Sequence, residues 1–136
     1  INSKIKNPKD VINGFTTIDD KTYADSVNIP KVIFNEDKIL VYMSRKKIPG
    51  FKREKDEPKK YYKQVCIYAF NREELKAFAK FGRKSILEQS EDIEILRFLD
   101  LGKTIRLVET EDSSLAVDVP EDVVKIEKVM KDVYGR

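Results

Sequence analysis

Asp118 is the residue whose type and position first suggest chemistry. It ends the short apolar run Leu115-Ala116-Val117 and is followed by Val119, Pro120 and two more acids. In open α/β sheets, ligands gather at the carboxyl ends of strands, where a carboxylate can reach a metal that bridges phosphate oxygens. The same aspartate could instead cap the helix that begins near Pro120, a contact worth about 1 kcal/mol. Spacing alone favours the cap, and both interpretations stay open at this point.

Four further polar side chains stand where they could contact a ligand. Arg45 follows a predicted hairpin and could grip a carboxylate or phosphate with two hydrogen bonds, or could be a surface charge. Gln64 and Tyr68 lie four residues apart on one predicted strand, so they point to the same face. Tyr68 could belong to the core or contact a ligand. Glu88 has the spacing of a capping box in SILE, which explains it without a ligand.

The composition excludes several kinds of site. The 136 residues include no histidine and a single cysteine. Ser-His and Cys-His catalysis and His-ligated zinc are therefore excluded within this chain. A metal would be held by carboxylates, which favours a hard ion such as Mg²⁺. Cys66 lies in QVCIYAF and is predicted to be a small buried residue. The GKT at 102–104 leaves a predicted helix and enters a strand, the reverse of a phosphate-binding P-loop.

Length and charge indicate one soluble domain. The chain is 40% hydrophobic and 38% charged, and no apolar run approaches the roughly 20 residues of a membrane span. We therefore expect a cytoplasmic protein without membrane contact. The basic stretch 45–60 has Phe51 as its one aromatic residue, which favours a solvated loop over a nucleic-acid patch. The chain begins at Ile1 without a signal-peptide pattern, so we expect a fragment or a processed piece.

Hydrophobic periodicity predicts strands and helices in alternation, which is the α/β class. The predicted strands are 32–34 and 39–42, which form a hairpin, then 61–70, 104–109 and 115–117. The predicted helices are a short one around 8–14, one at 72–81 between Asn71 and Gly82, one at 86–99, and one from about 120 with a buried stripe of Val123, Ile126, Met130 and Val133.

Four segments in a fixed order carry a resemblance to a known family: YMSRKKIPG (42–50), QVCIYAF (64–70), SILEQSEDIEILRFLDLGKTIRLVET (85–110) and LAVDVPEDV (115–123). Together they resemble the C-terminal half of the sugar-acid cytidylyltransferases of the CMP-Kdo synthetase (3-deoxy-manno-octulosonate cytidylyltransferase) type. The resemblance implies the C-terminal part of a Rossmann-like, three-layer nucleotide-diphospho-sugar transferase fold. It divides the chain into an N-terminal connecting segment (1–30), a β-hairpin dimerisation region with a charged loop (31–63), and an α/β sugar- and metal-binding half-domain (64–136).

The resemblance also implies a reaction and its participants. In that family, CTP and an eight-carbon sugar acid give a CMP-sugar and pyrophosphate with the help of Mg²⁺, in a cytoplasmic homodimer. The metal-ligating aspartate of the VD-x-PED motif corresponds to Asp118. The sugar-binding residues correspond to Arg45, Tyr68, Glu88 and Gln89.

Two departures and one absence qualify these implications. Gln64 stands where the family usually has a histidine, and Cys66 where it usually has a glycine. Gln64 can bond a hydroxyl but cannot carry charge, so an 8-amino or nonulosonic acid is an alternative to Kdo. The nucleotide-binding half of the family is absent from this chain. We therefore expect no catalysis by the chain alone, and a non-catalytic interaction domain of the same architecture is the alternative function.

Overall fold

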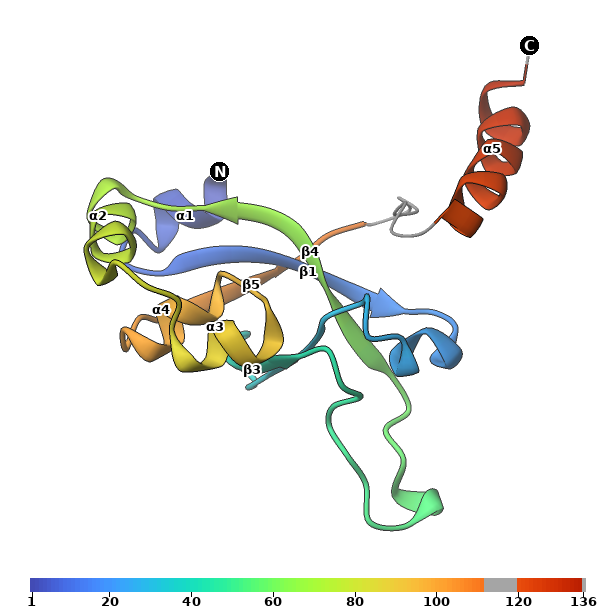
Figure 1. Ribbon diagram of the computed structural model, residues 1–136, viewed down its shortest axis with the longest axis horizontal. Coiled ribbons are helices and arrows are strands. Elements are labelled where there is room, and N and C mark those ends of the chain that lie inside the picture. The colour runs from blue at the N-terminus through green and yellow to red at the C-terminus, as the bar shows by residue number, and fades with distance from the viewer. Residues whose placement is uncertain (112–119, 136) are drawn as a thin grey trace.

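The computed structural model describes residues 1–111 and 120–135. Residues 1–111 form one mixed β-sheet with short helices beside it, and the helix at 120–134 lies apart from the sheet (Figure 1). The strands are β1 (Val11–Ile18), β2 (Lys31–Phe34), β3 (Leu40–Ser44), β4 (Tyr61–Ala69) and β5 (Ile105–Glu109), in the sheet order β3-β2-β4-β1-β5. The helices are α1 (Asn2–Lys6), α2 (Arg72–Phe81), α3 (Ile86–Glu91), α4 (Leu96–Asp100) and α5 (Pro120–Tyr134), with short 3₁₀ turns at Lys21–Asp25 and Glu54–Asp56. The expected α/β class is confirmed. None of these helices is long and apolar enough to cross a membrane.

Strand β1 lies inside the sheet, and the helix predicted around 8–14 is wrong. β1 runs antiparallel to β4 and parallel to β5. Five consecutive residues of β1, from Val11 to Phe15, are buried, so the alternation that marks a half-exposed strand is missing. Gly14 permits the close approach of β4, because a Cβ there would lie 3.2 Å from the Cβ of Val65. Residues 1–30 therefore supply a central strand and do more than connect, while the three-part division of the chain stays a prediction.

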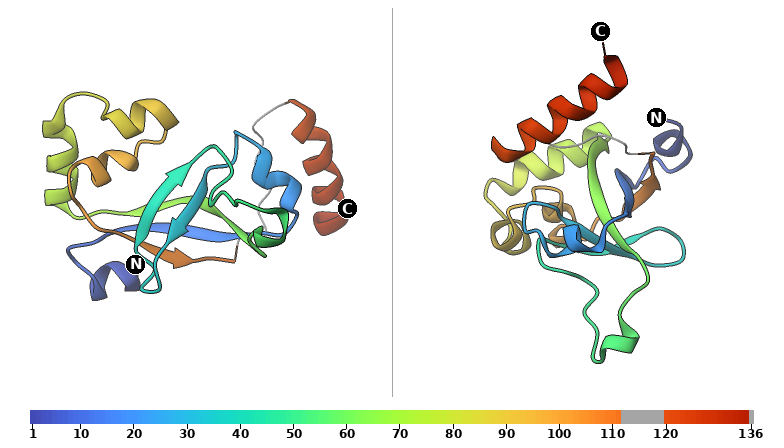
Figure 2. Two further views of the ribbon diagram at one scale, coloured as in Figure 1. Left: turned by 90° about the horizontal axis from the view of Figure 1, so that it is seen from below. Right: turned by 90° about the vertical axis from the view of Figure 1, so that its right-hand side faces the viewer.

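The predicted hairpin is confirmed, and its tip reaches the far end of the sheet. β2 and β3 pair antiparallel, whereas β2 meets β4 in register only at Lys31 and Lys63. The main-chain nitrogen of Leu107 in β5 donates to the carbonyl of Lys38, 2.7 Å away. The sheet therefore curls until its two outermost strands meet at the hairpin tip, as can be followed in Figure 2.

The main core lies where the sheet packs against α3 and α4. The ring of Phe15 lies 4.7 Å from that of Phe34 and 5.8 Å from that of Tyr62, between centroids. The buried members of this core are Val11, Phe15, Val32, Leu40, Met43, Ile93, Ile95, Leu96, Phe98, Ile105 and Leu107. Burial of these side chains supplies the main driving force for folding.

Helix α2 has the predicted bounds, and the single helix predicted for 86–99 is wrong. Asn71 caps α2 in a reciprocal capping box with Glu74, and Gly82 ends it with a φ of 70°. The second helix is broken at Asp92, whose φ of 51° ends α3 and redirects the chain before α4 begins. Since Ile93 and Ile95 both become buried in the connection, packing outweighs the helical continuity that periodicity predicted.

Two predicted burials are also wrong. Cys66 is exposed, because it lies on the part of β4 that is irregularly paired with β1. On α5, Val123 and Met130 are 43% and 54% exposed, and Figure 1 shows this helix away from the sheet that the stripe was expected to cover. The strand predicted at 115–117 lies outside the described residues.

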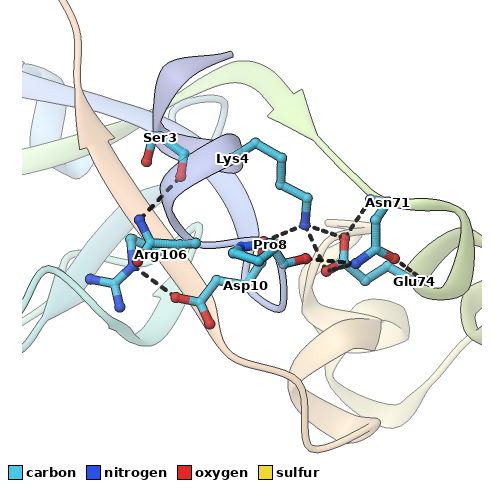
Figure 3. A network of polar contacts seen from close by, with 8 residues as sticks. Ser3, Lys4, Pro8, Asp10, Asn71, Glu74 and Arg106 are labelled. Atoms are coloured by element: carbon cyan, nitrogen blue, oxygen red, sulfur yellow. Dashed lines mark hydrogen bonds and ion pairs between the residues drawn. The ribbon is translucent and has the colours of Figure 1, made fainter.

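A polar network fixes α1 beside the sheet (Figure 3). The Nζ of Lys4 lies 2.7 Å from both carboxylate oxygens of Glu74 in α2 and 2.6 Å from the carbonyl of Asp10. The carboxylate of Asp10 accepts from Nε of Arg106 in β5, at 2.7 Å. These contacts join α1, α2 and β5 around the start of β1.

Lys31, at the start of β2, is fully buried, and its ammonium group is bonded to main-chain carbonyls. Its ammonium group donates to the carbonyls of Ser26, at 2.7 Å, and Arg45. Burial disfavours the charged form and lowers the pKa of Lys31 from 10.5 to about 8. Within the protein, this lysine therefore loses its proton more readily than in the unfolded chain.

This burial predicts a pH dependence of stability that a Lys31→Met variant isolates. Between the folded pKa near 8 and the unfolded value of 10.5, the unfolded chain binds more protons. The free energy of unfolding of the wild type, minus that of Lys31→Met, should therefore rise by about 1–2 kcal/mol from pH 8 to pH 10. Urea denaturation of both proteins at both pH values measures it. A difference that stays flat or falls would contradict the burial of a charged group here.

Candidate functional site

Gln64 and Tyr68 form a polar pair on β4, as their spacing predicts. The Nε2 of Gln64 donates to the hydroxyl of Tyr68, at 2.9 Å, and to Oδ1 of Asn13, at 3.3 Å. Gln64 and Asn13 are buried, whereas Tyr68 is 38% exposed. The pair therefore presents one accessible phenol that is oriented by two buried amides.

Asn13 is the member of this cluster that sequence reasoning missed. Its Nδ2 donates to the carbonyls of Val65, at 2.9 Å, and Ile67, at 3.1 Å. These bonds span the bulge at which β4 has two more residues than β1, because Asn13 pairs with Tyr68 while the next residue pairs with Val65. The signal that could have identified Asn13 is its place as a polar residue within the apolar run VINGF. It was missed because an Asn-Gly step is typical of a turn, and the segment was not predicted to be a strand.

The cluster is uncharged at neutral pH. Burial of its hydroxyl, together with the neighbouring Cys66 thiol, raises the pKa of Tyr68 even though part of its ring is exposed. Neither Gln64 nor Asn13 can ionise. The cluster can therefore donate and accept hydrogen bonds to hydroxyl groups, but it is not suited to move protons near pH 7.

An aromatic pocket of about 300 Å³ opens beside Tyr68. Its lining residues are Tyr68, Phe70, Leu75, Phe78, Glu94, Ile95 and Phe98. The rings are in contact, with centroids 5.8 Å apart for Tyr68 and Phe70 and 5.3 Å apart for Phe70 and Phe98. Glu94 is the one charged lining residue, so the pocket suits an apolar group better than an anionic one.

Glu88 is held inside the protein rather than presented to a ligand. Its side chain completes a capping box with Ser85. Its two oxygens also lie 2.7 Å from Nε and Nη2 of Arg97, and these bonds lower the pKa of Glu88. Its neighbour Gln89 is exposed. The Glu88–Gln89 pair therefore divides into one structural residue and one that a ligand can reach.

Arg45 clamps the hairpin onto the end of α3. Its guanidinium group donates to the carbonyls of Glu91 (2.6 Å), Asp92 (3.0 Å) and Val27 (3.0 Å), and its main-chain nitrogen donates to the Glu91 carboxylate at 2.8 Å. Carbonyls at a helix end lack helical partners and carry partial negative charge, which a guanidinium group balances. The structure thus brings Gln64 and Tyr68 together and engages Arg45 and Glu88 in separate internal contacts.

The expected metal ligand cannot be placed in this geometry. Asp118 lies outside the described residues. Among the side chains that the structure describes, no group of three acidic or cysteine residues is arranged to hold a metal ion. A magnesium site therefore stays a prediction.

Comparisons with known proteins agree on one kind of relative. No protein-family model matches the chain. A 3-deoxy-manno-octulosonate cytidylyltransferase from Flavobacterium johnsoniae is 36% identical over 115 residues, which are 82% of this chain and 46% of the relative. Its counterpart from Christiangramia forsetii is also 36% identical and covers 85% of this chain and 46% of its own length. A solved CMP:2-keto-3-deoxy-manno-octonic acid synthetase complexed with CTP is 28% identical with a TM-score of 0.81, covering 96% of this chain and 53% of that one.

The chain is an α/β protein that is similar in sequence and in fold to cytidylyltransferases. In particular, the resemblance to the 3-deoxy-manno-octulosonate cytidylyltransferases is confirmed. The chain spans about half the length of the curated relatives it matches.

The different roles of Glu88 and Gln89 can be tested by measuring the free energy of unfolding of variants at each position. Glu88→Ala leaves the Arg97 guanidinium group without its partner in a largely buried place, so it should lower the free energy of unfolding by about 3–5 kcal/mol. Gln89→Ala changes the exposed neighbour and should alter it by less than about 0.5 kcal/mol. Urea denaturation compares the two variants. Equal effects would contradict the structural role given to Glu88.

Proposed function

We propose that this chain is the sugar-binding half of a cytidylyltransferase that transfers CMP from CTP to Kdo or a related sugar acid. The observation that carries the proposal is the agreement of sequence and fold with 3-deoxy-manno-octulosonate cytidylyltransferases over most of the chain. The solved CMP:2-keto-3-deoxy-manno-octonic acid synthetase, which this chain is similar to, is a complex with CTP, and this supports CTP as the nucleotide.

In this proposal, the polar cluster on β4 orients the sugar. Gln64 and Tyr68 bond sugar hydroxyls, and the exposed Gln89 adds a further amide. Arg45 and Glu88 act through the elements they hold, because their charged groups are bonded within the protein. Catalysis by such uncharged groups consists mainly of positioning.

The reaction joins the anomeric hydroxyl of the sugar to the α-phosphorus of CTP. The new bond forms between that oxygen and phosphorus, and the hydroxyl proton passes to water. The bond from phosphorus to the bridging oxygen breaks, and pyrophosphate leaves with the electron pair. A bound Mg²⁺ would compensate the charge of the phosphates. We propose Asp118 as one of its ligands, with the remaining ligands outside the described residues.

The neutral Gln64 bears on which sugar acid is bound. A glutamine offers both a donor and an acceptor, so it accommodates a hydroxyl or an amino group. Its position beside Tyr68 therefore supports an 8-amino or nonulosonic acid as the second candidate substrate.

We further propose that the chain forms a homodimer through residues 31–63. Val41 in β3 and Phe51 in the charged loop are exposed apolar side chains of this region. Sedimentation at high micromolar concentration should show a dimer, and Val41→Asp should shift it toward monomer. A stable wild-type monomer would contradict this interface.

The activity is tested by joining this chain to the part of a relative that it does not match. The chain alone should release no pyrophosphate from CTP and Kdo. A chimera that places the uncovered half of the Flavobacterium johnsoniae relative before Ile1 should release it. Turnover by the chain alone would contradict the proposal. A folded chimera that is inactive with Kdo, with an 8-amino sugar acid and with a nonulosonic acid would also contradict it, and would favour a non-catalytic interaction domain.

Asp118→Asn in the same chimera tests the metal ligand. Asparagine caps a helix about as well as aspartate, so the thermal midpoint should stay within a few degrees. The rate should fall at least about a hundredfold, equal to about 2.7 kcal/mol of barrier. Asp19→Asn, at an exposed aspartate, is the matched control and should leave the rate unchanged. Normal turnover by Asp118→Asn would return this residue to the capping interpretation.

A further inference from the structure

The side-chain amide of Asn13 has one orientation that fits its surroundings. Its nitrogen faces the main-chain carbonyls of Val65 and Ile67, at 2.9 Å and 3.1 Å. Carbonyls accept hydrogen bonds and cannot donate them, so the amide nitrogen and not the amide oxygen must face them. Both protons of Nδ2 are used in this way. The main chain of β4 therefore decides that Oδ1 of Asn13 faces Gln64.

Gln64 takes its orientation from Asn13. Because Oδ1 of Asn13 only accepts, Gln64 must turn its nitrogen toward it, and the two atoms lie 3.3 Å apart. The second proton of Nε2 goes to the hydroxyl of Tyr68, at 2.9 Å. Both donors of Gln64 are thus used inside the protein, and its Oε1 is the polar atom that remains for a ligand.

The Oε1 atom of Gln64 can be reached from outside. Among the residues that the structure describes, no donor is bonded to this oxygen, and no buried polar side-chain atom lacks a hydrogen-bond partner. The oxygen therefore lies within the 8% of Gln64 that is exposed. The hydroxyl of Tyr68, which accepts from Gln64, keeps its own proton to donate. One acceptor and one donor stand side by side.

This pair of atoms selects the groups that a ligand can bring to it. A hydroxyl group can donate to Oε1 of Gln64 and accept from Tyr68, and a protonated amino group can donate to Oε1. A carboxylate or keto oxygen only accepts, so it would face Oε1 with no proton between them. Glu94, in the pocket that Tyr68 also lines, adds negative charge nearby and further disfavours a carboxylate.

We propose that Asn13 is a positioning residue that fixes Gln64 with Oε1 outward, so that position 64 takes a hydroxyl or protonated amino group of the sugar acid and rejects its carboxylate. The inference rests on the proposed function. A glutamine without this neighbour could turn its amide to suit either a donor or an acceptor. Asn13 removes that freedom without touching the sugar, so part of the specificity comes from a residue behind the site.

NMR spectroscopy of the isotope-labelled chain tests the fixed amide without a ligand. The Nε2 protons of Gln64 should exchange with water at least about tenfold more slowly than those of the exposed Gln89. Asn13→Ala should abolish this difference. The main-chain amide of Val11, which donates to the carbonyl of Thr104 at 2.9 Å, should stay protected and show that the variant is folded. Equal exchange at Gln64 and Gln89 in the wild type would overturn the inference.

Titration of the same chain with sugar acids tests the direction of the hydrogen bond, with the chemical shifts of Tyr68 as the readout. The probes are Kdo analogues in which one hydroxyl group at a time is replaced by a protonated amino group, which only donates, or by a keto group, which only accepts. At the hydroxyl position whose binding Gln64→Met weakens, the amino analogue should bind at least about tenfold more tightly than the keto analogue. Kdo itself, in the same titration, shows whether a hydroxyl or an amino group is preferred there.

Two variants assign this preference to its residues. Gln64→Met keeps the length of the side chain and leaves the bulge of β4 intact, and it should abolish the preference for the amino analogue. Asn13→Ala should reduce the preference to less than about threefold, because Gln64 can then turn its amide. A purely structural defect would weaken both analogues and leave the preference unchanged. If Asn13→Ala does not fold, the wild type and Gln64→Met still decide the direction of the bond.

Three results would overturn the inference: a preference for the keto analogue, no binding of any probe by the folded chain, or an unchanged preference in folded Asn13→Ala. The chimera decides the activity separately. Pyrophosphate release together with a keto preference would reject this inference alone, and an amino preference without release would reject the activity alone.

Discussion

The buried amide of Asn13 is the contact on which the arrangement of β4 depends. A strand with two extra residues opposite its neighbour leaves main-chain carbonyls without ladder partners, and unpaired buried carbonyls cost free energy. Asn13 resolves this by donating to two of them, and its remaining oxygen orients Gln64. One side chain thus stabilises an irregular strand and sets the direction of the groups next to Tyr68. An aspartate in its place would lose both donors, so the amide is required for chemical reasons and not for its size.

Charged groups perform a second task, which is to add polar contacts between elements, including some that the core also joins. Arg45 ties the hairpin to the end of α3, and Arg97 ties α3 to α4 through Glu88. Lys4 and Arg106 do the same for α1 and β5. These pairs are partly or wholly buried, so each acts as a geometric constraint whose loss would leave an unbalanced charge. The short helices α3 and α4 hold their positions through such contacts, since neither is long enough to be stable by itself.

The elements that could be predicted are those whose signals are local. Asn71 and Gly82 mark the ends of α2, and two β-rich runs on either side of a polar turn mark β2 and β3. What could not be predicted depends on partners distant in sequence. β1 is a strand because β4 and β5 enclose it, and α3 stops at Asp92 because the core takes up the residues that follow. For the candidate site, the spacing of Gln64 and Tyr68 predicted that their side chains share one face, and the SILE pattern predicted the capping box of Glu88. The Arg97 partner of Glu88 and the carbonyl partners of Arg45 lie on other elements and leave no local signal in the sequence.

The parallel pairing of β1 with β5 has a consequence for synthesis. β1 is made before the other described strands, and the strand that covers its outer side is the last of them to leave the ribosome. Until then β1 is an edge strand with an apolar sequence, which is the kind of segment that pairs with the wrong chain. Translation that stalls before residue 105 therefore leaves a nascent chain that is prone to aggregation, and chaperone demand should be concentrated in that interval of elongation.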